Sequence, residues 1–172
     1  NLLVFKQIEA IRLLKPIFAI VENVTGFERK FVTRPIDGVT ESVAERAIRE
    51  IEQLGYNVGK VMINAADYGV PQVRKRVILF AISKDFAGTL SASQLLQDVM
   101  LKVGMEQRKA LHLATGRYVN VEEAIGDLSG DDVTIDPEFP NYNTCKYLPA
   151  TSAYQKLMRK NYRSEEHTSE LQ

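Results

Sequence analysis

The 172-residue chain has very little cysteine and histidine: one cysteine, Cys145, and two histidines. A single cysteine cannot form an intramolecular disulfide framework, and it excludes a zinc site made of several thiolates. Cys145 stands in an Asn-Thr-Cys-Lys segment with no adjacent base, so we interpret it as a bystander rather than a nucleophile. His112 has no second histidine or carboxylate at ligand spacing, which favours a surface or hydrogen-bonded histidine. No metal site is predicted.

Long apolar runs and phosphate-binding loops are also missing. No apolar run approaches the roughly 20 residues of a membrane-spanning helix, and no signal peptide is visible, so we expect a cytoplasmic protein without a membrane partner. The sequence contains neither a Walker-type loop nor a Gly-x-Gly-x-x-Gly loop. Residue 1 is an Asn within an expected helix. We therefore expect the true amino terminus to be missing.

The charges give no strong indication of a partner. The chain has 22 basic and 22 acidic residues, which balance at pH 7. This balance neither demands nor excludes nucleic acid, so any DNA contact would depend on the local placement of Lys and Arg. The apolar residues, 45% of the chain, suffice for one domain or a large part of one.

The last ten residues, 163–172, are similar to a common sequencing-library adapter translated in frame. A solvated polar tail is the alternative interpretation. We expect the native chain to stop near Tyr162, and residues 163–172 are left out of the inferences about the fold.

The first half of the chain has the pattern of an α/β protein. Apolar spacing predicts a helix over 2–14, with Leu3, Phe5, Ile8, Ile11 and Leu14 on one face. The apolar run 17–21 predicts a strand buried on both sides, which Glu22-Asn23-Val24 closes. A helix capped by Thr40 or Ser42 and ended by Gly55 follows, carrying Val43, Ala47, Ile48, Ile51 and Leu54.

Two more strands are predicted over 58–63 and 76–82, with a loop over 64–71. This order is typical of half of a doubly wound sheet, and the direct step between the last two strands indicates an antiparallel pair. Beyond residue 83 we expect a helix beginning at Ser91 or Ser93, a helical turn over 121–128, a loop over 131–143 and a helix over 151–161 capped by Thr151 or Ser152.

Glu22 follows the predicted strand 17–21 directly. Open α/β sheets bind ligands where their strands end, and we expect the carboxyl group there to be partly desolvated and able to donate a proton to a ring nitrogen. The alternative is a Glu that only caps the next segment. Asn23 is expected to be structural, holding the turn through side-chain hydrogen bonds.

Gln72, Arg74 and Arg76 alternate in the sequence, so in an extended segment they face one side. Two guanidinium groups on one face suit phosphates and the carbonyl oxygens of bases, and with Glu22 they could converge on a nucleobase. The alternative is a basic strand start paired with nearby carboxylates. Asp67 and Tyr68 could reach the same pocket, although a turn-forming role is favoured for Asp67.

Five motifs, in this order along the chain, closely resemble those of the DNA (cytosine-5) methyltransferase family. They are Pro16-Ile-Phe-Ala-Ile-Val-Glu-Asn-Val24, Gly55-Tyr56, Asn64-Ala-Ala-Asp-Tyr-Gly-Val-Pro-Gln-Val-Arg-Lys-Arg76, Val119-Asn-Val-Glu-Glu-Ala-Ile-Gly-Asp-Leu128, and Tyr154-Gln155 with Met158-Arg159. The resemblance implies a partial class I, Rossmann-like fold that uses S-adenosylmethionine. It also implies double-stranded DNA as partner and a possible cognate restriction endonuclease system.

The resemblance further implies roles for single residues. In this family a cysteine thiolate adds to carbon 6 of a flipped cytosine, and carbon 5 is then methylated. Glu22 matches the acid that contacts N3, Arg76 the guanidinium that holds the base carbonyl, and Arg74 its companion near the nucleotide, with Gln72 and Arg74 binding DNA. Leu3 matches a position near the cofactor. A proton donor at N3 and a cation at O2 would both stabilise the charge that builds up on the ring.

The chain departs from the family pattern at both ends. The Pro-Cys loop with the nucleophile and the Phe-x-Gly-x-Gly cofactor loop would lie upstream, and most of the target-recognition region would follow residue 162. We therefore expect an internal fragment without activity: a partial catalytic domain over 1–84, the start of the target-recognition region over 85–162, and the tail over 163–172. A tRNA methyltransferase of the same fold and a non-catalytic nucleic-acid-binding relative remain alternatives.

Overall fold

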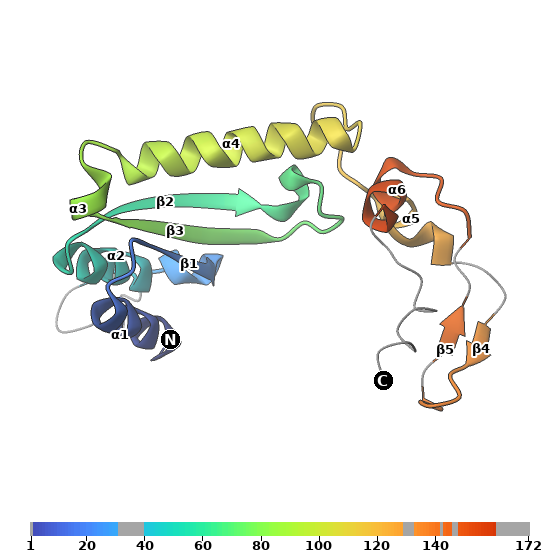
Figure 1. Ribbon diagram of the computed structural model, residues 1–172, viewed down its shortest axis with the longest axis horizontal. Coiled ribbons are helices and arrows are strands. Elements are labelled where there is room, and N and C mark those ends of the chain that lie inside the picture. Colours follow the sequence, from blue (N-terminus) through green and yellow to red (C-terminus); the bar gives the residue numbers. More distant parts are fainter. Residues whose placement is uncertain (1, 31–39, 129–132, 142, 146–147, 161–172) are drawn as a thin grey trace. The chain divides into compact units, whose positions relative to one another are not determined.

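The computed structural model describes residues 2–30, 40–128, 133–141, 143–145 and 148–160. The chain divides into two compact units, which are described separately (Figure 1). The first contains residues 1–65 and 73–105, and the second contains residues 66–72 and 106–172. The domain boundary predicted at residue 84 stays a prediction.

The first unit is built on a three-stranded sheet. Its strands are β1 (Phe18–Val24), β2 (Tyr56–Asn64) and β3 (Lys75–Ser83), in the order β1-β3-β2. The central strand β3 runs antiparallel to both neighbours, so the predicted antiparallel step from β2 to β3 is confirmed. The register places Val24 opposite Arg76, which brings the end of β1 beside the start of β3.

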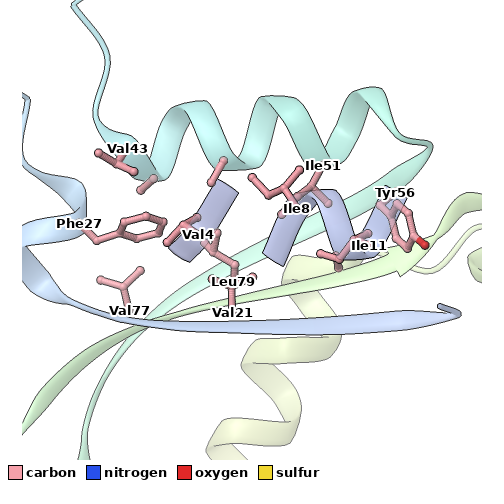
Figure 2. Close-up of a cluster of buried hydrophobic side chains, with 13 residues drawn as sticks. Val4, Ile8, Ile11, Val21, Phe27, Val43, Ile51, Tyr56, Val77 and Leu79 are labelled. Carbon is pink, nitrogen blue, oxygen red and sulfur yellow. The ribbon is translucent and has the colours of Figure 1, made fainter. Parts of the chain in front are cut away.

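Two helices cover one face of this sheet, α1 (Leu2–Leu14) and α2 (Val43–Gln53). Figure 2 shows the core between them and the strands. The capping box of Ser42 and Glu45 begins α2, and Gly55, at a φ of 90°, follows its end, as predicted. The buried side chains are Val4, Ile8, Ile11, Val21, Phe27, Val43, Ala44, Ala47, Ile51, Tyr56, Val77, Leu79 and Ala81.

The predicted apolar face of α1 is correct only in part. Ile8 and Ile11 are buried, but Leu3 and Leu14 are 85% and 78% exposed, and Val4 is buried instead. Leu3 and Leu14 lie at the two ends of the helix, and α1 packs on α2 only through the face that carries the central residues. Helical spacing predicts which residues share a face of the helix, but not how far along the helix that face is covered by other elements.

The opposite face of the sheet meets α3 (Lys84–Ala87) and the first part of α4 (Ala92–Ala110). The predicted start of this helix is confirmed, because the Ser91 hydroxyl accepts a hydrogen bond from the backbone N–H of Gln94. Strand β2 and the start of α4 approach closely at Gly59. A Cβ atom there would lie 2.6 Å from the backbone oxygen of Ala92, so only glycine fits.

The prediction that the strand around 17–21 is buried on both sides is wrong. Val21 is 2% exposed, whereas Phe18, Ile20 and Val24 are 61%, 57% and 52% exposed. The reason is that, among the described residues, β1 is an edge strand with a single neighbour, and α1 and α2 cover only the face that carries Val21. The strand also extends to Val24, so Glu22 lies within it rather than after it.

The second unit contains a helical pair and a short hairpin. Its elements are the 3₁₀ turn η2 (Ala65–Tyr68), which begins at the unit boundary, α5 (Val121–Ile125), η3 (Gly126–Leu128), β4 (Val133–Ile135), β5 (Asn143–Cys145) and α6 (Ala153–Arg159). Both predicted helices are confirmed, and Ser152 caps α6. The predicted loop over 131–143 is wrong at 133–135 and at 143, because the three β-branched residues 133–135 pair with β5 and the two prolines lie in the connection.

Polar contacts join α6 to the α5–η3 segment. The Ser152 hydroxyl donates to the carbonyl of Glu123 over 2.5 Å, and the amide of Gln155 donates to the carbonyl of Glu122 over 3.2 Å. Arg159 donates to the carboxylate of Asp127 over 2.6 Å, and Asp127 is only 3% exposed. The buried charge is thus paired, as burial requires. None of the helices within the described ranges is long and apolar enough to cross a membrane.

Candidate functional site

Glu22 and Arg76 meet on one face of the sheet. Glu22 lies on β1, two residues before Val24, the direct partner of Arg76 on β3, so the two side chains are diagonal neighbours on the same face. The Oε1 atom of Glu22 is 2.5 Å from the Nε atom of Arg76. Arg76 also donates through Nη1 to the carbonyl of Lys75 over 2.8 Å. The structure therefore brings together the predicted acid and one of the predicted guanidinium groups.

The two partners differ in exposure. The side chain of Arg76 is 17% exposed, whereas that of Glu22 is 55% exposed. The prediction of a partly desolvated Glu22 carboxyl is therefore wrong for this chain, and the reason is the same as for Phe18 and Ile20: nothing in the described residues covers this part of the face. The pair presents an open carboxyl group beside a guanidinium that is held by the backbone.

Arg74 precedes β3 and is exposed. Its backbone is fixed on both sides, because its N–H donates to the side-chain oxygen of Asn64 over 3.0 Å and its carbonyl accepts from the N–H of Ala65 over 2.9 Å. No ion pair joins its guanidinium to another residue in the described part of the chain. The sequence left open that these arginines only pair with nearby carboxylates. Arg76 does so, through Glu22, and among the described residues Arg74 does not.

Gln72 does not continue the strand. Its N–H donates to the carbonyl of Val70 over 2.7 Å, which bends the chain there, and regular pairing begins only at Lys75. The predicted alternation of residues 72, 74 and 76 along one extended segment therefore holds only for the last part. Gln72 is exposed and belongs to the second unit, while Arg74 and Arg76 belong to the first.

Asn23 and Leu3 have simpler surroundings. The side-chain oxygen of Asn23 accepts a hydrogen bond from the N–H of Val24 over 2.9 Å, a local contact within β1 rather than in the expected turn. Leu3 is 85% exposed, so the described residues do not enclose a cofactor pocket around it. The described residues also contain no group of three His, Cys, Asp or Glu side chains that could hold a metal ion.

One long-range contact within the second unit has no counterpart in the sequence-based predictions. Asp67, expected to form a turn, lies in η2, and its carboxylate accepts a hydrogen bond over 3.0 Å from the hydroxyl of Tyr118, 51 residues further along. The neighbouring Tyr68 has its pKa raised by burial and, secondarily, by the negative charge of Asp67. No local pattern predicts a pair so far apart in the sequence.

Comparison with known protein families decides what kind of protein carries these residues. The model of the family described as C-5 cytosine-specific DNA methylase matches residues 1–171. The chain belongs to this family. Its sheet and helices are accordingly part of the class I, Rossmann-like fold of S-adenosylmethionine-dependent methyltransferases. The match extends past Tyr162 into residues that the structure does not describe, and the adapter origin of 163–172 stays a prediction.

Curated relatives carry the same kind of name. The chain is 29% identical over 160 residues to the Type II methyltransferase M.DdeI of Desulfomicrobium norvegicum, which covers 93% of this chain and 33% of the relative. It is 30% identical over 131 residues to M.BspRI of Lysinibacillus sphaericus, covering 76% and 26%. It is 25% identical over 173 residues to M.MthTI of Methanothermobacter thermautotrophicus, covering 96% and 43%. The chain thus spans less than half the length of each relative.

Proposed function

We propose that the whole protein of which this chain is a part transfers a methyl group from S-adenosylmethionine to carbon 5 of cytosine in DNA. The observation that carries the proposal is the contact of Glu22 with Arg76 in a chain of the C-5 cytosine-specific DNA methylase family. The relatives named Type II methyltransferases favour DNA over tRNA as the substrate, and a restriction–modification system as the setting.

The pair suits one edge of cytosine. N3 and O2, the carbonyl oxygen on the neighbouring ring atom C2, lie on the same edge of cytosine, so a carboxyl group and a guanidinium 2.5 Å apart can contact both at once. Glu22 would donate a proton toward N3 while Arg76 holds O2, and binding of the base would replace the direct ion pair with these two contacts. Nucleophilic addition at carbon 6 places negative charge on this edge, where both groups stabilise it.

Arg74 and Gln72 would bind the nucleic acid around the flipped base. Arg74 has an exposed guanidinium on a backbone fixed by Asn64 and Ala65, which suits a phosphate close to the target nucleotide. Gln72 is an exposed amide two residues earlier, with donors and an acceptor for polar groups of DNA. Asn23 would keep β1 in place beside the pair.

The cofactor would supply the electrophilic methyl group, and the described residues do not enclose a pocket around Leu3. Leu3, the one position that resembles a cofactor neighbour, is exposed. The nucleophile of the family stands in a Pro-Cys loop, whereas the only cysteine of this chain, Cys145, follows Thr144. We therefore propose that the 172-residue chain by itself does not transfer methyl groups. Tritium transfer from labelled S-adenosylmethionine to DNA by the purified chain would refute this.

The substitution Glu22→Gln in the whole protein tests the role of the acid. Loss of a proton donor that acts in the addition step should lower kcat by about 100-fold or more, while the Kd for DNA changes by less than about threefold. Glu106→Gln is the matched control, because Glu106 is an exposed glutamate on α4 and lies outside the five motifs that resemble the family. Equal losses of kcat and DNA binding in Glu22→Gln would show that Glu22 is structural.

A further inference from the structure

The loop between β2 and β3 belongs to a different unit from the strands it connects. Residues 66–72 cluster with residues 106–172, although residues 65 and 73 on either side belong to the first unit. This loop leads directly to Gln72 and then to Arg74. Contacts that hold this loop on the second unit therefore also determine the position of Gln72, the first of the predicted DNA contacts.

Gly69 packs tightly against Leu111. Gly69 is buried at a φ of 82°, and a Cβ atom there would lie 2.2 Å from Cδ1 of Leu111. Leu111 is itself 5% exposed and follows α4, where its N–H donates to the carbonyl of Gln107 over 3.0 Å. The apolar part of the attachment is thus a close contact: a side chain at position 69 would displace the end of the Leu111 side chain, and the positive φ favours glycine there.

Tyr118 supplies the polar half. Its hydroxyl donates to the carboxylate of Asp67 over 3.0 Å. Its own backbone is held on both sides: the N–H of Arg117 donates to the carbonyl of Ala114, and Asn120 caps α5 through the N–H of Glu123. A hydroxyl on a fixed backbone, bonded to a charged acceptor, is a stronger constraint than a neutral pair would be.

We propose that Tyr118 is a positioning residue for DNA binding: through Asp67 it fixes the loop 66–72 and so sets the position of Gln72 against DNA. The proposal rests on the proposed function. Gln72 follows Asp67 by five residues, and the turn at Gly69 and the bond of the Gln72 N–H to Val70 leave the intervening backbone little freedom. A shift of Asp67 is therefore transmitted to Gln72.

The proposal predicts an effect on binding rather than on turnover. Gln72 would contact DNA before and during the reaction alike, so a displaced loop weakens the ground state and the transition state equally. In the whole protein, Tyr118→Phe should raise the KM for DNA by about 3- to 10-fold, the range for one lost hydrogen bond, with kcat within twofold. Tyr154→Phe is the matched control, because no described residue is hydrogen-bonded to the Tyr154 hydroxyl.

Variants of the acceptor separate positioning from general damage. Asp67→Asn keeps an acceptor oxygen and should stay close to the unaltered protein, whereas Asp67→Ala should reproduce the rise in KM of Tyr118→Phe. The double variant Tyr118→Phe with Asp67→Ala should be no worse than either single variant, because both remove the same bond. Additive losses in the double variant, or a fall in kcat with an unchanged KM, would overturn the proposal.

Hydrogen exchange of the Gly69 amide provides a readout that does not need activity. This N–H donates to the carbonyl of Ala66 over 3.2 Å, within the loop. Tyr118→Phe should accelerate its exchange by about 3- to 10-fold, and Tyr154→Phe should leave it unchanged. Unchanged exchange in Tyr118→Phe would overturn the proposal even if KM rises. Absence of methyl transfer by the unaltered whole protein would instead refute the proposed function, and the exchange measurement would still decide whether Tyr118 holds the loop.

Discussion

The carboxylate of Glu22 and the guanidinium of Arg76 lie 2.5 Å apart across the β1–β3 pair, yet more than half of the Glu22 side chain is exposed. Ion pairs in such surroundings contribute about 0–1 kcal/mol to stability, because solvent screens the attraction. The contact is therefore not needed to hold the two strands together, because residues 18–24 of β1 already pair with residues 76–82 of β3 along the backbone. We propose that its value lies in what the two groups do to a ligand.

A double-mutant cycle on this pair tests that conclusion. Glu22→Ala, Arg76→Ala and the double variant should give a coupling in the free energy of unfolding below about 1 kcal/mol, measured by denaturant titration. The same substitutions in the whole protein should each lower methyl transfer by about 100-fold or more. A coupling above about 2 kcal/mol would mean that the pair is mainly structural.

Gly59→Ala should destabilise the first unit. The added Cβ would lie within 2.6 to 2.8 Å of backbone atoms of Ala92 and Ser93, which cannot move without shifting α4. We expect a loss of about 1–3 kcal/mol in the free energy of unfolding, seen as a lower Tm. Gly26→Ala is the matched control, because the nearest atom to its Cβ is a side-chain carbon of Val24 at 4.0 Å. Equal Tm values for the two variants would contradict the close packing at Gly59.

Asp127→Asn should loosen α6 from the α5–η3 segment. The change removes the charge that pairs with Arg159 at a site where the Asp127 side chain is 1% exposed, and breaking such a buried pair costs about 3–5 kcal/mol. Faster hydrogen exchange of the α6 amides would report this loss. Asp98→Asn, on the exposed side of α4, should leave the exchange of α6 unaltered. Unaltered exchange in both variants would show that the pair contributes little.

The capping box of α2 predicts a dependence of stability on acid. The backbone N–H of Ser42, followed by Lys30 and the Ser42 hydroxyl, lowers the pKa of Glu45 from 4.5 to about 2. Because the folded pKa is below the unfolded one, the stabilisation is present above pH 4.5 and is lost as the pH falls toward 2. Denaturant titrations between pH 5 and pH 2 should show a smaller loss of stability in Glu45→Gln than in the unaltered chain.

The Ser42→Ala variant separates the two halves of that box. It removes the hydroxyl that accepts from the N–H of Glu45, which should lower the free energy of unfolding by about 1 kcal/mol at neutral pH. It keeps the backbone N–H of residue 42, the largest cause of the lowered pKa of Glu45. Most of the acid dependence should therefore remain, and its complete loss would contradict the assignment of the cause to the backbone.

Local patterns in the sequence were enough to predict most elements. The caps at Ser42, Ser91 and Ser152 and the apolar spacing of α2 are decided within a few residues, and each is found as predicted. The antiparallel step from β2 to β3 also follows from local information, since a short connection between strands gives an antiparallel neighbour. These features do not depend on the rest of the protein.

Features set by distant residues could not be predicted in this way. The exposure of Phe18 and Ile20 depends on which strands and helices lie beside β1, and no property of the run 17–21 specifies its neighbours. The contacts of Tyr118 with Asp67 and of Arg159 with Asp127 join residues 51 and 32 positions apart. Neither pair has a spacing that a helix or a hairpin would bring together.

The placement of loop 66–72 in the second unit bears on how family members could recombine. Consider a chimera in which residues 106–172 are replaced by those of a relative. It would keep the original loop 66–72, whose contacts are made to the original Leu111 and Tyr118. The seven loop residues would have to travel with the exchanged segment, so a single crossover point does not suffice. Exchange of the whole second unit in this architecture therefore requires two stretches of gene that are separated by more than thirty codons.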